Sequence, residues 1–417
     1  MEVGGRVLRA RLKLVDADGE AMRRGPVVIE QIAHAFGFGN IGFDFVGLLG
    51  GEPSGPDADE RVFGGADADR AAPLLPALLD VFDTVTLPFY WRGFEPVRGE
   101  PDTERLLTTA RWFASHGVRV KGHPLVWHTL TPHWLDDLTD AEVEAAIRAR
   151  IERDVSRFAG VIDLWDAINE AVILPVFTAE ENAVTRLAQR KGRVEMVRMA
   201  FETARAANPS ARLVLNDFDL SEDYERLIAE CLDAGIAIDA IGLQTHMHQG
   251  YRGEEQVAGI LDRFARFGLP LQLTETTLLS GDLMPPHIVD LNDYVVDSWP
   301  STPEGEARQA DEVVRHYRTV VGHPAVESLT YWGLTDDGAW LGAPAGLLRA
   351  DASPKPAYLA LRELIRGEWW HAPRAVETDA SGLVDVHGFA GRYRATTATG
   401  VTEFDLTPGE AELTVRV

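Results

Sequence analysis

Short apolar runs alternate with longer amphipathic segments along most of this chain, and this alternation limits the possible folds more than any other feature. Eight runs can be counted, at residues 36–42, 83–88, 118–123, 161–168, 212–216, 238–243, 271–275 and 328–332. Strands that alternate with helices pair in parallel, and eight such strands suit a closed barrel. We therefore predict an α/β fold of the (β/α)8 type, a TIM barrel.

The segments between the runs carry helix signals. Thr139 and Glu142 form a capping-box pattern, and Gly160 ends the same segment just before the fourth run. The apolar residues of this segment recur at helical spacing, namely Val143, Ile147, Ile151, Val155 and Phe158. A doubly wound nucleotide-binding sheet uses similar units, but no Gly-rich phosphate loop follows any run, so the barrel is preferred.

The two ends of the chain have a different pattern. Residues 6–35 and 381–417 show short alternating segments separated by turn residues, which is typical of β-strands. Neither end is long enough to fold alone, so we predict that together they form one small β-sandwich. The expected organisation is an accessory β-sandwich from residues 1–35 plus 372–417, packed against a catalytic barrel of residues 36–371.

The net charge of the chain limits the classes of molecule that it is expected to bind. It has 417 residues and a formal net charge of -25, which repels phosphate backbones and anionic lipids and argues against nucleic acid and membrane partners. This negative charge does not repel a neutral sugar. The first residues contain no apolar signal-peptide core. We expect a cytoplasmic protein as the sequence stands, or a secreted one if a signal peptide precedes it, and the oligomeric state stays open.

Polar residues follow six of the runs. In a βα barrel the catalytic groups lie where the strands end, so these positions are candidates for a site. They lie in the segments KGHPLVWH, WDAINEA, LNDFD, GLQTHMH, LTET and YWGLTDDGAW. One polar strand end is common, but six around one rim predict an active site.

Two glutamates lie among these strand ends. Glu170 follows the fourth run and Glu275 ends the seventh. Glycoside hydrolysis needs one protonated carboxyl group to assist the leaving oxygen and one ionised carboxylate, and retaining enzymes hold the two roughly 5 Å apart. We predict that Glu170 is the general acid/base and Glu275 the nucleophile.

With these motifs in order, the chain resembles glycoside hydrolase family 10, the endo-β-1,4-xylanase family, through its third to eighth runs. The resemblance implies a retaining hydrolase that acts on xylan or xylo-oligosaccharides. It also implies supporting roles for Asn169, which should contact the sugar 2-hydroxyl, for His246 near Glu275, for Asn216 near Glu170, and for Asp166. The further residues expected to bind substrate are His123, Trp127, Gln244, Trp332, Trp340, Tyr90 and Trp91. Of these, Trp91 fits a packing role equally well.

Neither a metal nor a cofactor is expected. His123 with His128, and His246 with His248, have spacings that suggest a metal, but neither pair comes with a complete carboxylate or cysteine set.

The resemblance breaks at two places. The strand-two segment of the family carries polar groups that bind the next sugar unit, whereas here Thr86, Leu87 and Tyr90 stand in their places. The aspartate that follows the nucleophile by two residues is replaced by Thr277, which offers a hydroxyl but no charge.

These departures leave alternatives open. A hydrolase or transglycosidase of a smaller or decorated non-xylan β-glycoside is the alternative among enzymes. A carbohydrate-binding barrel without turnover is the alternative of another class, and the presence of both glutamates argues against it.

Overall fold

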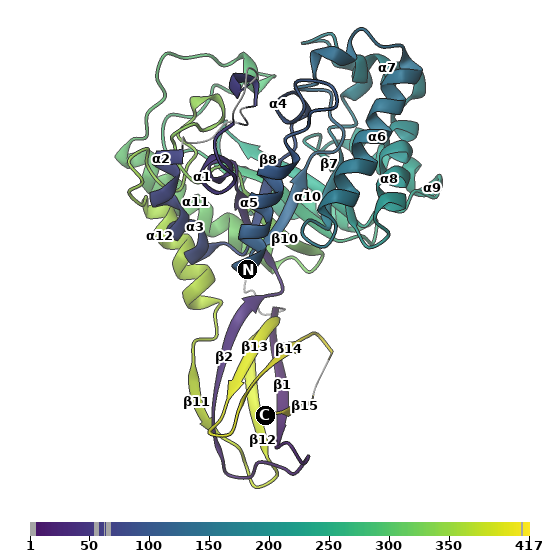
Figure 1. Ribbon diagram of the computed structural model, residues 1–417. Helices are drawn as coiled ribbons and strands as arrows, with labels where there is room; N and C mark the ends of the chain where they lie inside the picture. Colours follow the sequence, from purple (N-terminus) through teal and green to yellow (C-terminus); the bar gives the residue numbers. More distant parts are fainter. Residues whose placement is uncertain (1–5, 54–57, 62, 64–67, 410–411) are drawn as a thin grey trace.

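A computed structural model describes residues 6–53, 58–61, 63, 68–409 and 412–417. Its larger part is a closed parallel barrel with the strand order β10-β3-β4-β5-β6-β7-β8-β9 (Figure 1). The barrel strands are β3 (Gly37–Ile41), β4 (Thr84–Pro88), β5 (Arg119–His123), β6 (Leu164–Asn169), β7 (Arg212–Asp217), β8 (Ala240–Met247), β9 (Leu271–Leu278) and β10 (Val326–Tyr331). Each predicted run contains or overlaps one of these strands, so the predicted α/β barrel is confirmed.

Helices surround the barrel (Figure 1). The α-helices are α1 (Phe45–Gly50), α2 (Ala68–Ala71), α3 (Leu75–Val81), α4 (Trp91–Phe94), α5 (Thr103–Ser115), α6 (Asp140–Phe158), α7 (Ala183–Lys191), α8 (Arg193–Ala207), α9 (Glu222–Asp233), α10 (Glu254–Ala265), α11 (Pro303–Gly322) and α12 (Pro356–Arg362). Shorter helical turns are η2 (Ala58–Glu60), η3 (Ala72–Leu74), η4 (His133–Leu135), η5 (Leu174–Val176), η6 (Leu291–Asp293), η7 (Trp340–Gly342) and the π-turn η8 (Glu363–Glu368).

Helix α6 shows how local sequence signals produce these elements. Thr139 is its N-cap, and the capping box with Glu142 is present, which satisfies backbone N–H groups at the helix start. All the apolar residues predicted to share one face are fully buried, so this face packs into the barrel layer and fixes the helix beside the strands.

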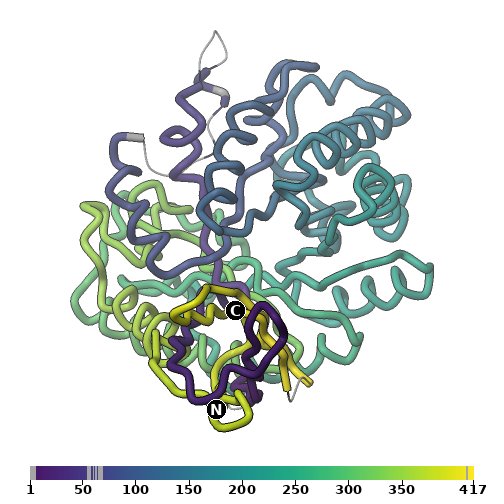
Figure 2. Tube along the Cα trace, turned by 60° about the horizontal axis from the view of Figure 1, so that its bottom comes forward, coloured from purple at the N-terminus to yellow at the C-terminus, as the bar shows by residue number. Residues whose placement is uncertain are grey.

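The terminal segments form two further sheets, with strand orders β12-β1-β15 and β11-β2-β13-β14. Their strands are β1 (Val7–Val15), β2 (Pro26–His34), β11 (Arg374–Glu377), β12 (Leu383–Phe389), β13 (Gly391–Thr396), β14 (Val401–Leu406) and β15 (Glu412–Arg416). Side chains of both sheets share one separate apolar core, which includes Leu12, Ile29, Val386 and Tyr393. The two ends of the chain therefore build one sandwich, and Figure 2 shows the purple and yellow segments side by side.

The sandwich and the rim with polar residues lie at opposite ends of the barrel. Strand β2 ends at His34 and β3 begins at Gly37, so the sandwich adjoins the end where the barrel strands begin (Figure 1). His34 packs at this junction, with its ring against Phe38 and Trp370. The strands end at the other face, where the candidate site lies.

Among the described residues, no helix has both the length and the apolar character needed to cross a membrane.

Candidate active site

Glu170 follows directly on strand β6, in a backbone conformation that is unusual for its type. Its φ angle is 57°, in the left-handed region that non-glycine residues seldom adopt. Its N–H donates to the carbonyl of Asn216 at 2.8 Å, which ties the turn to the end of β7. The indole N–H of Trp127 donates to Glu170 Oε2 at 2.7 Å. The carboxyl group is thus held at the strand end by two neighbouring barrel segments.

Glu275 lies inside strand β9 and is buried. Its Oε1 accepts a hydrogen bond from Asn216 Nδ2 at 3.1 Å, and its Oε2 lies 3.2 Å from His246 Nε2. His123 Nε2 lies 3.9 Å from Oε1. The Asn216 and His246 donors stabilise a carboxylate, because an ionised carboxyl group only accepts hydrogen bonds.

Amide side chains connect the two glutamates. Asn216 Nδ2 donates to Asn169 Oδ1 at 2.7 Å as well as to Glu275, and Asn169 Nδ2 donates to Glu170 Oε1 at 3.1 Å. Gln244 Nε2 contacts Asn169 Oδ1 at 3.1 Å and Glu170 Oε1 at 3.3 Å. The Asn216 side chain, expected beside Glu170, therefore bonds Glu275 and Asn169, and only its backbone carbonyl bonds Glu170.

The two carboxyl groups differ in electrostatic setting. Burial raises the pKa of Glu170 to about 7; the charge of Glu275 adds to the rise, and the hydrogen bonds from Trp127 and Gln244 oppose it. Burial is thus the larger cause and the neighbouring charge the smaller one. A carboxyl group with this pKa is half protonated near neutral pH, as a general acid requires.

Thr277 contacts the histidine that faces Glu275. Its hydroxyl oxygen lies 3.2 Å from His246 Nδ1, while His246 Nε2 faces the Glu275 carboxylate. The carboxylate can only accept, so Nε2 carries the proton in this contact, and a neutral ring then accepts the Thr277 hydroxyl proton at Nδ1. Thr277 thereby holds the ring in the orientation that donates to Glu275.

A buried ion pair between Lys121 and Asp166 contacts His123. His123 Nδ1 lies 2.8 Å from Asp166 Oδ2, and Lys121 Nζ lies 2.7 Å from Asp166 Oδ1. Burial alone would raise the pKa of Asp166, but Lys121 and the contact with His123 outweigh it and keep that pKa below its ordinary value. Asp166 thus stays ionised and orients the imidazole.

Aromatic rings line the rim around these groups. Tyr90 packs with ring-centroid distances of 5.4 Å to Trp127 and 5.9 Å to His123. Trp332 meets His123 edge to face at 5.3 Å, and Trp340 lies 4.9 Å from His246 and is 39% exposed. Indole faces of this kind pack against the C–H faces of sugar rings.

Trp91 does not join this group. It is buried in α4, its indole N–H donates to Glu95 Oε2 at 3.0 Å, and the Arg150 guanidinium lies 4.6 Å from its ring centroid. Thr86 and Leu87 are likewise buried within β4. We therefore correct the substrate-contact expectation for Trp91 to the packing role.

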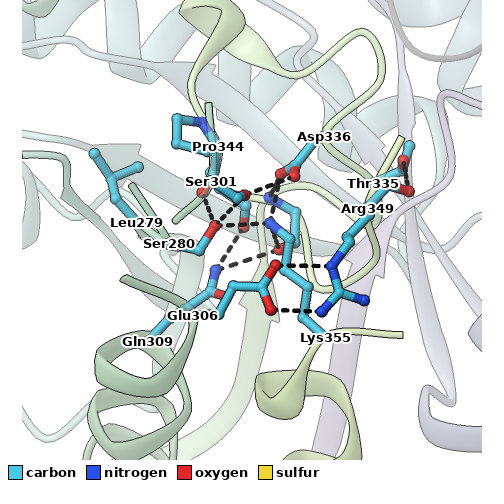
Figure 3. Close-up of polar contacts among 12 residues, drawn as sticks. Leu279, Ser280, Ser301, Glu306, Gln309, Thr335, Asp336, Pro344, Arg349 and Lys355 are labelled. Atoms are coloured by element: carbon cyan, nitrogen blue, oxygen red, sulfur yellow. Dashed lines mark hydrogen bonds and ion pairs between the residues drawn. The ribbon is translucent and has the colours of Figure 1, made fainter. Parts of the chain in front are cut away.

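A buried polar cluster fixes the segment that carries Trp340 (Figure 3). Lys355 is fully buried and its ammonium donates to Asp336 Oδ1 at 2.7 Å, Ser280 Oγ at 2.8 Å and the carbonyl of Gly346 at 2.9 Å. Ser280 follows β9, and Asp336 lies four residues before Trp340. One ammonium group thus ties the loop after β9 to the loop after β10.

Sequence reasoning missed two residues of the site. His128 Nε2 lies 3.6 Å from Glu170 Oε2, and burial lowers the pKa of His128 to about 3, so the ring is neutral there. Thr274 donates its hydroxyl to Asn216 Oδ1 at 2.6 Å. His128 belongs to the segment KGHPLVWH and Thr274 to the segment LTET, both of which the sequence marks as candidates. Spacing within a segment does not tell which of its side chains face the two glutamates.

No cluster of three or more histidine, cysteine, aspartate or glutamate side chains that could hold a metal occurs within the described part of the chain.

Comparison with known proteins shows the family to which this chain belongs. The family model described as glycosyl hydrolase family 10 matches residues 89–364. Endo-1,4-beta-xylanase B of Thermotoga neapolitana is 28% identical over 296 residues, which cover 66% of this chain and 78% of that enzyme. Endo-1,4-beta-xylanase C of Paenibacillus barcinonensis is 25% identical over 351 residues, which cover 73% of this chain but only 31% of that enzyme. The chain thus spans about a third of the length of the Paenibacillus relative.

Solved structures share the fold. A structure titled as GH10 from Paenibacillus barcinonensis has a TM-score of 0.62 and 24% identity, and covers 79% of this chain and 95% of that one. Xylanase 10B of Thermotoga petrophila, solved in complex with xylobiose, has a TM-score of 0.61 and 22% identity, and covers 80% of this chain and 95% of that one. At these identities the likeness concerns the barrel architecture.

Proposed function

The chain belongs to glycosyl hydrolase family 10, and we propose that it cleaves β-1,4-linked xylose chains by a retaining, double-displacement mechanism at Glu170 and Glu275. The observation that carries this proposal is the pairing of a partly buried Glu170, whose pKa is raised to about 7, with a Glu275 that accepts hydrogen bonds. One group is suited to give a proton and the other to attack.

In the first step Glu170 protonates the glycosidic oxygen while Glu275 attacks the anomeric carbon. Asn216 and His246 hold the attacking carboxylate in place through their N–H donors. Asn169 uses one amide N–H toward Glu170, and we assign its second N–H to the 2-hydroxyl of the sugar. The bond from carbon to the leaving oxygen breaks as the ester to Glu275 forms.

In the second step Glu170 acts as a base. Once Glu275 is an ester it carries no charge, so its contribution to the raised pKa of Glu170 disappears. Glu170 then holds its proton less tightly and takes one from the incoming water, which attacks the same carbon from the leaving-group side. The product keeps the β configuration.

Two observations support a xylose chain as the substrate, namely the side chains at the rim of the barrel and the names of similar proteins. Trp332 and Trp340 offer apolar ring faces, and His123, Trp127 and Gln244 surround the glutamates with polar groups. Similar proteins are named endo-1,4-beta-xylanases. A chain of neutral pyranose units fits a rim of this composition.

A second candidate is a hydrolase or transglycosidase that acts on shorter or decorated β-glycosides. The observation that favours it is the end of β4, where Thr86 and Leu87 are buried and Tyr90 packs against Trp127 and His123. These residues give one phenol hydroxyl where the family has several polar groups. Losing hydrogen bonds worth about 1 kcal/mol each would weaken binding of an outer sugar.

The test is a product profile on xylohexaose beside a panel of aryl β-xylosides and β-glucosides. The xylan proposal predicts internal cleavage of xylohexaose to xylobiose and xylotriose, with Glu275→Gln inactive on every substrate. Release of single sugars, with faster turnover of aryl glycosides, would favour the second candidate. Binding of oligosaccharides without hydrolysis of any of them would refute both.

A further inference from the structure

The hydroxyl oxygen of Thr277 lies between two histidines. It is 3.2 Å from His246 Nδ1 and 3.5 Å from His248 Nδ1, and it accepts the backbone N–H of Met247 at 3.4 Å. His248 directly follows strand β8, so all three partners come from the same strand end. The proposed mechanism uses His246 but gives His248 no part.

His248 is buried beside the candidate active site. It is 1% exposed, and its ring meets Trp340 edge to face at a centroid distance of 5.2 Å and lies 6.3 Å from the ring of Trp299. Its carbonyl accepts the N–H of Met284 at 2.9 Å, which ties it to the loop after β9. Burial lowers the pKa of His248 to about 3, so the ring is neutral and carries one proton.

The three partners of the Thr277 hydroxyl fix the direction of each hydrogen bond. A hydroxyl group donates one hydrogen bond and accepts two. Met247 offers a backbone N–H, which can only donate, and so fills one acceptor position. His246 holds its proton on Nε2, toward Glu275, so its bare Nδ1 takes the one hydroxyl proton. The remaining position on the oxygen accepts, and His248 Nδ1 must supply the N–H.

The second ring nitrogen of His248 agrees with this assignment. His248 Nε2 is buried, and no hydrogen-bond partner for it occurs among the described residues. A buried N–H without a partner is costly, because it loses the hydrogen bond that water would give it. The single proton of the neutral ring therefore belongs on Nδ1, which faces Thr277.

These groups form one chain of hydrogen bonds that all point toward the nucleophile. His248 Nδ1 donates to Thr277, Thr277 donates to His246 Nδ1, and His246 Nε2 donates to Glu275 Oε2. With both acceptor positions filled, Thr277 cannot accept a further N–H from His246. A doubly protonated His246 would thus lack an acceptor at Nδ1, and the neutral ring is favoured.

We propose that His248 is a positioning residue, which acts through Thr277 to keep His246 neutral and its Nε2–H directed at Glu275. The proposal rests on the proposed function for the role of Glu275 as the nucleophile. The proton positions on the two rings do not depend on any reaction, so they can be tested separately.

The first test measures these proton positions. Long-range proton–nitrogen NMR spectra of the full chain labelled with 15N-histidine distinguish a protonated ring nitrogen from a bare one, and His248→Phe and His246→Phe assign the signals. The expected result at neutral pH is a proton on Nδ1 of His248 and on Nε2 alone of His246. A proton on Nε2 of His248, or protons on both nitrogens of His246, would overturn the proposal.

The second test is a double-mutant cycle of His248→Phe and Thr277→Val, measured as kcat on an aryl β-glycoside that the enzyme hydrolyses. Phenylalanine keeps a ring against Trp340 but cannot donate, so His248→Phe should lower kcat about two- to fivefold with little change in KM. In the Thr277→Val background the same substitution should have little further effect, because the chain is already broken there. Equal losses in both backgrounds would contradict action through Thr277.

Two further variants separate positioning from packing. His248→Asn should retain more activity than His248→Phe, because its amide N–H can still donate to Thr277. His316→Phe is the matched control, since His316 is also buried and neutral and, within the described part of the chain, neither of its ring nitrogens has a partner. It should leave kcat unchanged, and a loss equal to that of His248→Phe would refute a specific role for His248. If no glycoside is hydrolysed, the proposed function fails and the NMR spectra still decide the proton positions.

Discussion

At the scale of single residues, the roles that we propose for Glu170 and Glu275 differ because their surroundings differ. Glu170 is partly buried, and its raised pKa of about 7 keeps a proton available near neutral pH. Glu275 faces two donors, Asn216 and His246, and His123 Nε2 lies 3.9 Å from its Oε1. The same side chain type thus suits the proposed role of acid in one place and of nucleophile in the other.

The pH dependence of catalysis follows from Glu170. The group must be protonated for the first step, and its protonated fraction falls as the pH rises through its pKa. We expect kcat/KM to decline above a pH of about 7. Measuring kcat/KM for hydrolysis of an aryl xyloside across a series of pH values tests this decline.

The control is Glu170→Ala with a dinitrophenyl leaving group, which needs no proton. This variant should lack the alkaline decline, and a decline that persists in it would assign the ionisation to another group.

Thr277 offers a second residue-scale prediction. Replacing it by valine removes the hydroxyl that orients His246 while keeping the shape, and loss of one hydrogen bond of about 1 kcal/mol should lower kcat by about five- to tenfold. Thr277→Ser keeps the hydroxyl and should retain most of the rate. If serine and valine variants lose the same activity, the hydroxyl does not orient the histidine.

At the scale of elements, the loops after β9 and β10 share one anchor. Lys355, at the start of α12, reaches Ser280 in the first loop and Asp336 in the second (Figure 3). Trp340 lies in this second loop. The position of the Trp340 indole thus depends on a contact made by the residue that precedes helix α12.

Replacing Lys355 by methionine tests this anchor. The variant leaves Asp336 and Ser280 without their cation, and breaking such a buried pair should lower the free energy of unfolding by about 3 kcal/mol. We also expect KM to rise more than kcat falls, because Trp340 loses its fixed position. Urea denaturation and steady-state kinetics measure the two effects. Arg362→Met, at an exposed ion pair with Asp80, is the control and should change neither.

The elements themselves could be predicted, but their register could not. Apolar runs and capping signals located all eight strands and helix α6. The pairing of β8 with β9 shifts between Leu243 and Gln244, which brings Gln244 level with Glu275. The alternation of side chains along a strand, which is all that the sequence pattern shows, does not reveal such a shift in pairing. For this reason the partner of the Asn216 side chain and the part played by Thr274 were not evident from the sequence.

At the scale of the whole molecule, the sandwich and the active site lie at opposite ends of the barrel (Figure 1). The sandwich has its own apolar core, to which both ends of the chain contribute. Its strands β1 and β2 lead into the barrel through the junction at His34. The sandwich therefore projects from the end of the barrel where the strands begin, away from the candidate site.

Leu12→Ala tests this separation. Leu12 is fully buried in the sandwich core, so truncation should lower the free energy of unfolding by about 2–5 kcal/mol. The kcat and KM of the folded enzyme should stay unchanged. Val401→Ala, at an exposed position of the same sandwich, should alter neither stability nor rate. A change in KM for Leu12→Ala would show that the sandwich takes part in substrate binding.

In the proposed mechanism Glu275 forms a covalent bond to the sugar, and mass spectrometry of the trapped enzyme can detect this bond. The probe is the 2-deoxy-2-fluoro analogue of an aryl β-glycoside that the enzyme hydrolyses, with a dinitrophenyl leaving group, because the fluorine slows the second step more than the first. We expect one added sugar per chain, located on Glu275 after peptide digestion, and no label on Glu275→Gln. A label on any other residue, or none while the parent glycoside is turned over, would contradict it.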